Sequence, residues 1–369
     1  MNQLFRWDQT GLFLLALAAG ILPFAVPEVC AAALREGLTL CSGPLLLSLF
    51  PFLVVSRLLV QCPESDLLAL PFRLAAWGIG IRTPCAARVL CIGFLGGFAP
   101  AASAAAQAVR TGQLTAEEAD ALLPACICSG PSFVVLTVGQ SLLGSAELGV
   151  LLFASQITAN YLTAALLNRF AGVRSVKPGS AAPASPAPPQ LDEILADAAI
   201  TYCKLCGFIL FFRMLAAGAG ALLPAGAGTL CAVLLEVCSG CDLASRTGRW
   251  GSLLCCAALS VQGLSVLLQV RTICPPEMTL RPLYRARMLH LPLSLALFYL
   301  LLPGGEADVF STLPARVLLM RRVPPDCALL VFAVCCMAAC TLRSGIRQVE
   351  QKQMARNAGG CCINSKTLL

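Results

Sequence analysis

The sequence predicts an all-α, polytopic membrane protein, and composition is the first reason. Of the 369 residues, 58% are hydrophobic and only 12% are charged, and the mean hydropathy is +0.80. A soluble globular protein carries about 25% charged residues, which wet its surface. The apolar residues are mainly Leu, Ala and Val, and this composition favours helices over the strands of a membrane barrel.

The second reason is a series of apolar stretches close to the ~20 residues that cross a bilayer as a helix. The first stretch follows Arg6 and is similar to a signal peptide, but we interpret it as a retained helix because many spans follow it. The predicted spans are 11–33, 38–60, 119–143, 148–167, 195–219, 250–270, 289–302 and 327–342.

Two further apolar segments, 86–109 and 222–244, are interrupted by glycine. Lys and Arg concentrate in the cytoplasmic loops of membrane proteins. Apart from Arg321 and Arg322, the basic residues fall on one side only when both interrupted segments are re-entrant hairpins. The sequence therefore predicts about eight transmembrane helices plus two re-entrant helical hairpins, with the N- and C-termini cytoplasmic.

The predicted elements form an inverted repeat, because each half contains a span, a hairpin and two more spans. The first hairpin enters from the cytoplasm and the second from outside. The predicted parts are an N-terminal helix (1–37), a first repeat (38–170), a Pro/Ala/Ser linker (171–191), a second, inverted repeat (192–303), and a last helix with a basic tail (304–369).

This architecture is typical of secondary transporters, in which paired interrupted helices bind the substrate near the bilayer midplane. Backbone polar groups cannot be left bare in hydrocarbon, so interrupted helices line a cavity or lie buried in protein. The alternative is that the glycines only allow close helix packing. The predicted substrate site contains Gly96, Gly97, Ser103, Gln107, Ser129, Gly130, Ser132, Glu236, Ser239, Gly240, Gln262 and Ser265.

Several charged residues invite specific interpretations. Glu236 lies in an apolar segment, where a carboxylate is costly and usually functional; Arg213 is its expected charge partner or that of a substrate carboxylate. We expect Arg57 to reach the cytoplasmic edge of its span. His290 is expected at a cytoplasmic interface, beside a basic loop that ends at Arg287.

Local motifs outside this site predict structure rather than chemistry. The sequence from Thr115 to Glu118 is a capping box that begins a helix. Most of the 21 cysteines lie in apolar runs, where cysteine acts as a small apolar side chain. With one histidine in the chain we expect no metal site, no cofactor and no nucleophile–base pair, and hence no enzyme.

The expected partners are the lipid bilayer and a small molecule. The basic residues are scattered at segment ends and form no aromatic–basic module, which argues against nucleic-acid binding. The sequence leaves open whether the chain forms a homo-oligomer.

An ordered series of motifs across most of residues 38–300 resembles the YlbJ family of sporulation membrane proteins, which is related to nucleoside-recognition gate-domain proteins. The motifs are SLFPFLVVSRLL at 48–59, GFLGGFAP at 93–100, CSGPSF at 128–133, LEVCSG at 235–240, GLSV at 263–266 and YRARMLH at 284–290. The resemblance implies transport of dipicolinic acid, a small planar dianion, across the outer forespore membrane during sporulation. The alternatives are a nucleoside or nucleobase permease and a non-transporting scaffold of a sporulation envelope complex.

Overall fold

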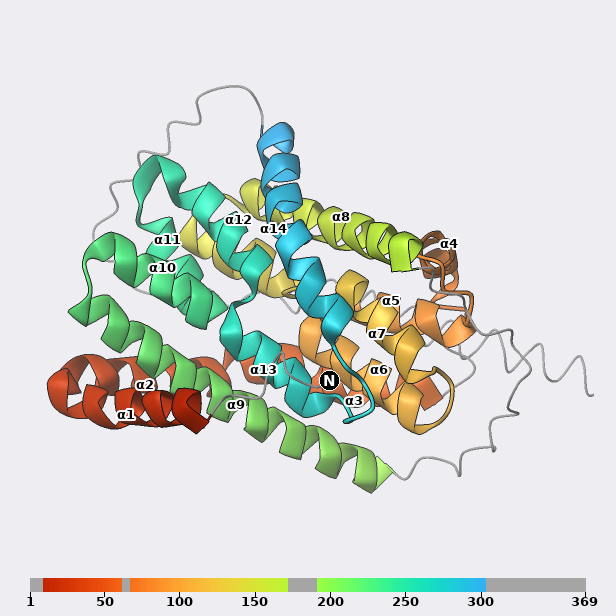
Figure 1. Ribbon diagram of the computed structural model, residues 1–369, viewed down its shortest axis with the longest axis horizontal. Helices are drawn as coiled ribbons and strands as arrows, with labels where there is room; N and C mark the ends of the chain where they lie inside the picture. The colour runs from red at the N-terminus through yellow and green to blue at the C-terminus, as the bar shows by residue number, and fades with distance from the viewer. Residues whose placement is uncertain (1–8, 62–66, 172–190, 303–369) are drawn as a thin grey trace, which may run out of the picture.

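The computed structural model describes residues 9–61, 67–171 and 191–302. These residues form helices and connecting turns, without a strand among them, so the predicted all-α class is confirmed (Figure 1). The predicted last span at 327–342, the basic tail and most of the Pro/Ala/Ser linker lie outside the described residues.

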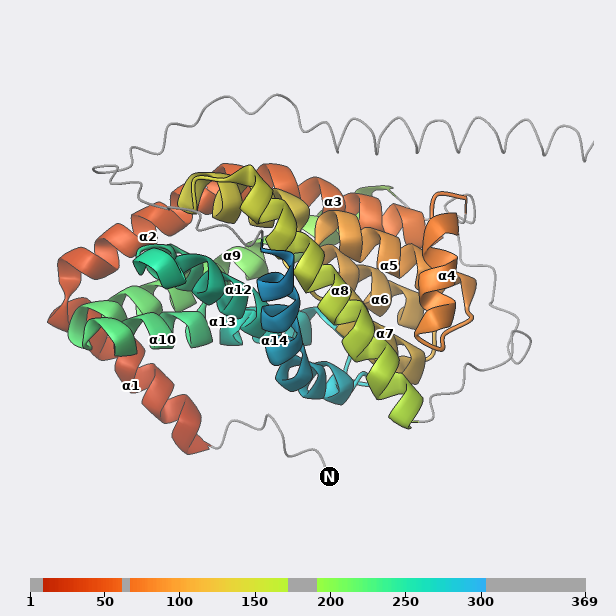
Figure 2. The ribbon, with the colours of Figure 1, turned by 90° about the horizontal axis from the view of Figure 1, so that it is seen from above.

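The beginning of the chain differs from the prediction. Helices occupy α1 (Gln9–Ala25), α2 (Pro27–Ser42) and α3 (Pro44–Gln61), so the expected boundary between the first two spans, at 34–37, lies inside α2. Prolines set the real boundaries, because a proline favours the first turn of a helix and keeps the residue before it out of the helical conformation. The axis bends by 108° between α1 and α2, and α1 turns away from the body of the protein (Figure 2).

The rest of the first half contains two interrupted helix pairs followed by one long helix. Its elements are α4 (Leu70–Gly78), α5 (Pro84–Gly96), α6 (Phe98–Arg110), α7 (Ala116–Cys126), the π-helix η2 (Ser132–Leu142) and α8 (Ala146–Ala171). The capping box is confirmed: Thr115 Oγ1 accepts from Glu118 N at 3.1 Å, and Glu118 Oε2 accepts from Thr115 N at 3.1 Å.

The second half begins with the longest described helix and again contains two interrupted pairs. Its elements are α9 (Leu191–Leu222), α10 (Ala225–Leu235), α11 (Val237–Ser245), the 3-10 turn η3 (Gly248–Trp250), α12 (Gly251–Val261), α13 (Gly263–Ile273) and α14 (Arg281–Leu301). The prediction began the last of these at 289, but α14 begins eight residues earlier, so the expected basic loop from 281 to 287 is helical.

The two halves pack into one another along several helices. α9 of the second half lies against α2 and α3, α13 lies against α6, and α14 lies against α7 and α8 (Figures 1 and 2). The contact between α6 and α5 is close because α6 consists largely of buried alanine. This interleaving places the interrupted helices of both halves in the interior.

Three described helical stretches are long and apolar enough to cross a membrane: Ala146–Ala171, Leu191–Leu222 and Gly248–Ile273. The bent pair of α1 and α2 makes a fourth if it counts as one span. These helices are consistent with an integral membrane protein. The other apolar helices of the described residues are shorter than a bilayer is thick, because breaks divide them.

Candidate functional site

In the first half, the break between α5 and α6 packs directly on the break between α7 and η2. Gly97, between α5 and α6, has φ +81° and ψ −162°, a conformation essentially restricted to glycine. A Cβ atom added at Gly97 would lie 2.7 Å from the backbone N of Gly130. The two chain segments therefore touch backbone to backbone, and the pairing requires glycine.

The second half repeats this arrangement with different residues. Glu236 separates α10 from α11, and Gln262, in the left-handed conformation at φ +65°, separates α12 from α13. A Cβ atom added at Gly263 would lie 3.0 Å from the backbone N of Glu236. The hairpin interruption thus lies at Glu236, whereas the predicted site residues Ser239 and Gly240 lie inside α11.

The two pairs of breaks meet at a hydrogen bond between the halves. Gln262 Nε2 lies 3.4 Å from Ser129 Oγ, and the side chains are 1% and 6% exposed. We call this region the helix crossing and define it by Gly96–Gly97, Cys128–Gly130, Glu236 with Ser239, and Gln262–Gly263. The crossing brings together seven of the twelve predicted site residues: Gly96, Gly97, Ser129, Gly130, Glu236, Ser239 and Gln262.

The carboxylate of Glu236 caps the N-terminus of α11. Oε1 accepts from Cys238 N at 2.9 Å, and Oε2 accepts from Ser239 N at 2.7 Å and from Ser239 Oγ at 2.9 Å. Its side chain is 2% exposed, so these donors replace the water that the carboxylate has lost. A carboxylate at this position also complements the positive end of the helix dipole.

Arg213 is not hydrogen-bonded to Glu236, contrary to one expectation. Its Nη2 donates to Glu36 Oε2 at 2.7 Å, and Glu36 belongs to α2. The ion pair joins α9 to α2, two helices whose packing the sequence did not predict. Arg213 therefore holds the N-terminal helices on the second half.

Arg287 is buried in α14 rather than lying in a cytoplasmic loop as predicted. Its side chain donates to Ile127 O at 2.8 Å, to Asn160 Oδ1 at 3.1 Å and to Ser260 O at 3.3 Å. The carbonyls of Ile127 and Ser260 are freed where α7 and α12 end. A cation at two helix C-termini is favourable because both carry partial negative charge.

A buried polar network surrounds Arg287. Gln156 Nε2 donates to Ser260 Oγ at 2.9 Å, and Ser260 Oγ lies 2.5 Å from Ser294 Oγ. His290 is completely buried within the protein, with Nε2 3.2 Å from Gln156 O. α14 begins before the histidine and turns it, with Arg287, toward α8 and α12.

The helix crossing offers both hydrogen-bond donors and partial negative charge. Arg287 has no carboxylate within ion-pair distance among the described residues. The helices α6, η2 and α13 begin at the crossing without a side-chain cap and present free N–H donors, whereas α5, α7, α10 and α12 end there with the negative ends of their dipoles. Gln262 Oε1 is buried at the same place without a hydrogen-bond partner in the described structure.

The remaining predicted site residues lie outside the crossing, on helices that begin there. Ser103 and Gln107 are on α6, where Ser103 Oγ accepts from Arg57 Nε at 3.3 Å. Ser265 Oγ accepts from Gln269 Nε2 at 2.9 Å on α13. Ser132 begins η2 and is half-buried, and Gly240 packs in α11.

The sequence interpretation missed the residues of the polar network, although their spacing carries a signal. Arg287, His290 and Ser294 recur at three- and four-residue intervals in an apolar helix, and so do Gln156 and Asn160 in α8. Such spacing places the side chains on one face of a helix. Two polar stripes in apolar helices indicate that these helices face each other.

No protein-family model, curated protein or solved structure matches this chain. The resemblance to the YlbJ family therefore rests on the motifs in the sequence, and functional argument rests on the geometry of the helix crossing.

Proposed function

We propose that the protein is a multi-pass membrane transporter of a small organic anion. The observation that carries the proposal is the meeting of four interrupted helices, two from each half, at the Ser129–Gln262 contact. Interrupted helices at membrane depth expose backbone donors and acceptors to whatever occupies the space between them. Transporters built from repeats place the substrate at such a point.

Hydrogen-bond donors at the crossing support an anion over a cation. Three helices begin there without a side-chain cap, and the guanidinium of Arg287 is buried nearby without a carboxylate partner among the described residues. The carboxylate of Glu236 keeps its negative charge, but it is bound by the N-terminus of α11 and does not compete for these donors. An anionic substrate would accept hydrogen bonds from the free N–H groups.

The proposed mechanism is alternating access between the two halves. Eight transmembrane helices and two re-entrant hairpins, α5–α6 and α10–α11, form the inverted repeat. Polar contacts join the halves at Ser129–Gln262 and at Arg57–Asp197, and such contacts exchange partners at lower cost than close apolar packing. Both termini lie in the cytoplasm.

The resemblance of the sequence to the YlbJ family implies that the substrate is dipicolinic acid and that the membrane is the outer forespore membrane. The alternatives are a nucleoside or nucleobase permease and a non-transporting scaffold. All three are separated by the same measurement, because they differ in what crosses the membrane.

The test is uptake of labelled dipicolinate and of uridine by proteoliposomes that contain the purified protein. We expect dipicolinate uptake above that of empty liposomes, and we expect Gln262→Glu to abolish it by placing a second carboxylate at the crossing. Gln140→Glu makes the same chemical change at an exposed position of η2 and should leave uptake unchanged. Uptake of uridine alone would favour the permease, and folded protein that moves neither solute would favour the scaffold.

A further inference from the structure

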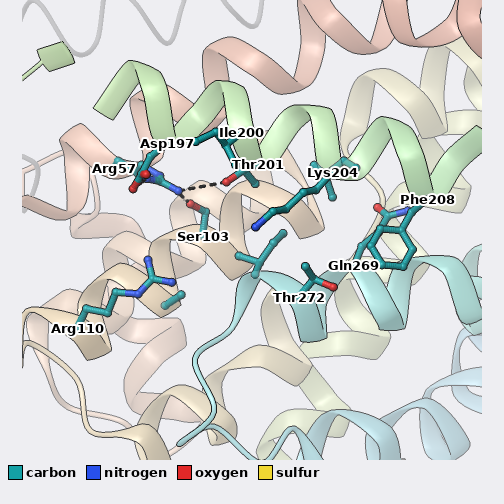
Figure 3. Close-up of a pocket in the computed structure, with 13 residues that line it drawn as sticks. Arg57, Ser103, Arg110, Asp197, Ile200, Thr201, Lys204, Phe208, Gln269 and Thr272 are labelled. Carbon is teal, nitrogen blue, oxygen red and sulfur yellow. Dashed lines mark hydrogen bonds and ion pairs between the residues drawn. The ribbon is translucent and has the colours of Figure 1, made fainter. Parts of the chain in front are cut away.

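A second polar site lies between the halves, separate from the helix crossing. It is a cavity of about 130 Å³ bounded by α3 and α6 of the first half and by α9 and α13 of the second (Figure 3). Its volume is well below the 300–1,000 Å³ of drug-sized sites, which limits any occupant to a small molecule.

The cavity carries excess positive charge. Arg57, Arg110 and Lys204 line it together with one carboxylate, that of Asp197. Figure 3 shows the basic side chains reaching toward the same space from three different helices. Two positive charges remain after Asp197 is counted, so a ligand with two negative charges would neutralise the cavity.

Arg57 is held in place by both halves of the protein. Its Nε donates to Ser103 Oγ and its Nη2 to Thr201 Oγ1, both at 3.3 Å, and its Nη1 forms an ion pair with Asp197. The side chain of Arg57 is 8% exposed, whereas that of Asp197 is 60% exposed. Arg57 therefore does not extend freely into solvent: Asp197 reaches in from the surface to a buried guanidinium.

The other walls suit an organic ion. Phe208 and Ile200 provide apolar surface, and Thr272 provides a hydroxyl. Gln269 is 2% exposed, and its Oε1 has no hydrogen-bond partner in the described structure. This amide oxygen only accepts hydrogen bonds, so Gln269 can bind a donor group of an occupant and supplies no donor to a carboxylate.

A polar stripe connects the cavity to the helix crossing. Ser265, Gln269 and Thr272 follow each other at three- and four-residue intervals on one face of α13, and Gln262 directly precedes this helix. Gln262 belongs to the crossing and Gln269 to the cavity, about 10 Å apart along the helix at ~1.5 Å per residue. By the distribution of Lys and Arg, the cavity lies on the cytoplasmic side of the crossing.

We propose that this cavity binds a small organic dianion before it reaches the helix crossing, and that one acidic group of the ligand displaces Asp197 from Arg57. The order of these two steps, first the cavity and then the crossing, rests on the proposed transport function. Asp197 then acts as an internal substitute for the ligand, and its release weakens a contact between α3 and α9. Binding and separation of the halves are thereby coupled.

The test is calorimetric titration of the purified protein in neutral detergent with dipicolinate, with picolinate as a monoanion of the same ring and with uridine as a neutral solute. We expect the dianion to bind at least tenfold more tightly than picolinate. Arg110→Gln and Lys204→Gln should each weaken dianion binding about tenfold. The matched control is Arg246→Gln, which removes a cation that is paired with Asp242 and does not line the cavity.

Asp197→Asn gives the sharpest result, because the two possible outcomes have opposite signs. If the ligand competes with Asp197, the variant binds the dianion about three- to tenfold more tightly; if Asp197 only supports Arg57, binding weakens. A thermal midpoint within about 2–3 °C of the parent confirms that the variant is folded. Weaker binding by folded Asp197→Asn protein overturns the displacement of Asp197.

An anionic lipid headgroup also presents negative charge to the cavity. If anionic lipid binds through Arg110 and Lys204 and dipicolinate does not, the inference is wrong. The cavity site and the proposed transport function can be refuted independently. If Arg110→Gln and Lys204→Gln weaken dianion binding but the protein shows no uptake, transport alone is refuted. Uptake that is insensitive to Arg110→Gln and Lys204→Gln, with unchanged binding, overturns the cavity alone.

Discussion

Replacing Gly97 by alanine tests whether the two breaks of the first half must touch. The added methyl would meet Gly130 N at 2.7 Å and Gly130 Cα at 3.0 Å, and backbone cannot move aside as a flexible side chain can. The backbone conformation at Gly97 costs alanine about 1–3 kcal/mol. Overpacking adds about 1–3 kcal/mol, so we expect Gly97→Ala to lose roughly 2–6 kcal/mol of stability.

Gly112→Ala is the matched control. Gly112 also has a positive φ, +68°, but a Cβ atom there has no atom within 4 Å. Alanine at this position lowers the stability only through its left-handed backbone conformation, which costs about 1–2 kcal/mol. The difference between the two variants therefore measures the contact between the breaks.

The assay is thermal unfolding of the detergent-solubilised protein, followed by the loss of helical circular dichroism at one scan rate. At about 2–4 °C per kcal/mol, the midpoint of Gly97→Ala should fall by at least ~4 °C, and by more than that of Gly112→Ala. Equal midpoints for the two variants would refute the close approach of Gly97 to Gly130. Dipicolinate uptake by the Gly97→Ala protein that remains folded should fall as well, because the added methyl group displaces the helix crossing.

Three further changes test the buried charges and the capping box. Arg287→Gln should destabilise the protein by roughly 2–4 kcal/mol, because the buried carbonyls of Ile127 and Ser260 lose their donor. Arg287→Lys should recover part of this loss. Unchanged thermal midpoints would contradict the role of Arg287 at the helix ends. Glu236→Gln keeps one capping acceptor and should cost only about 1 kcal/mol, so the protein still inserts, while dipicolinate uptake falls; normal uptake would remove Glu236 from the transport cycle. Thr115→Ala should lower stability by about 1 kcal/mol with normal uptake, and a loss of uptake would show that the capping box does more than begin a helix.

Local sequence predicted the features that depend on one residue and its neighbours. The capping box at Thr115 and the break at Gly97 were both identifiable, because a side-chain cap and a glycine-only backbone conformation are properties of short segments. The boundary at Pro27 was equally local, but the prediction gave weight to hydropathy and missed it. Hydropathy measures the transfer of side chains and does not record where a helix bends.

The partners of buried charges were beyond local reasoning. Arg213 binds Glu36, 177 positions away in the sequence, and Arg287 binds Ile127 O, 160 positions away. Several acidic and carbonyl groups would satisfy either arginine, and only the packing of α9 on α2 and of α14 on α7 and α8 selects among them. The burial of Arg287 beside the crossing was invisible for the same reason.

By itself, the sequence determined that this is an all-helical chain of membrane composition, with interruptions at Gly97 and near Gly240. These properties follow from side-chain transfer energies and from the backbone freedom of single residues. The tertiary structure alone decided that the breaks of the two halves meet at Ser129 and Gln262, and that Arg57, Arg110 and Lys204 share one cavity. Such meetings depend on how whole helices pack, because many distant contacts together fix the position of each helix end.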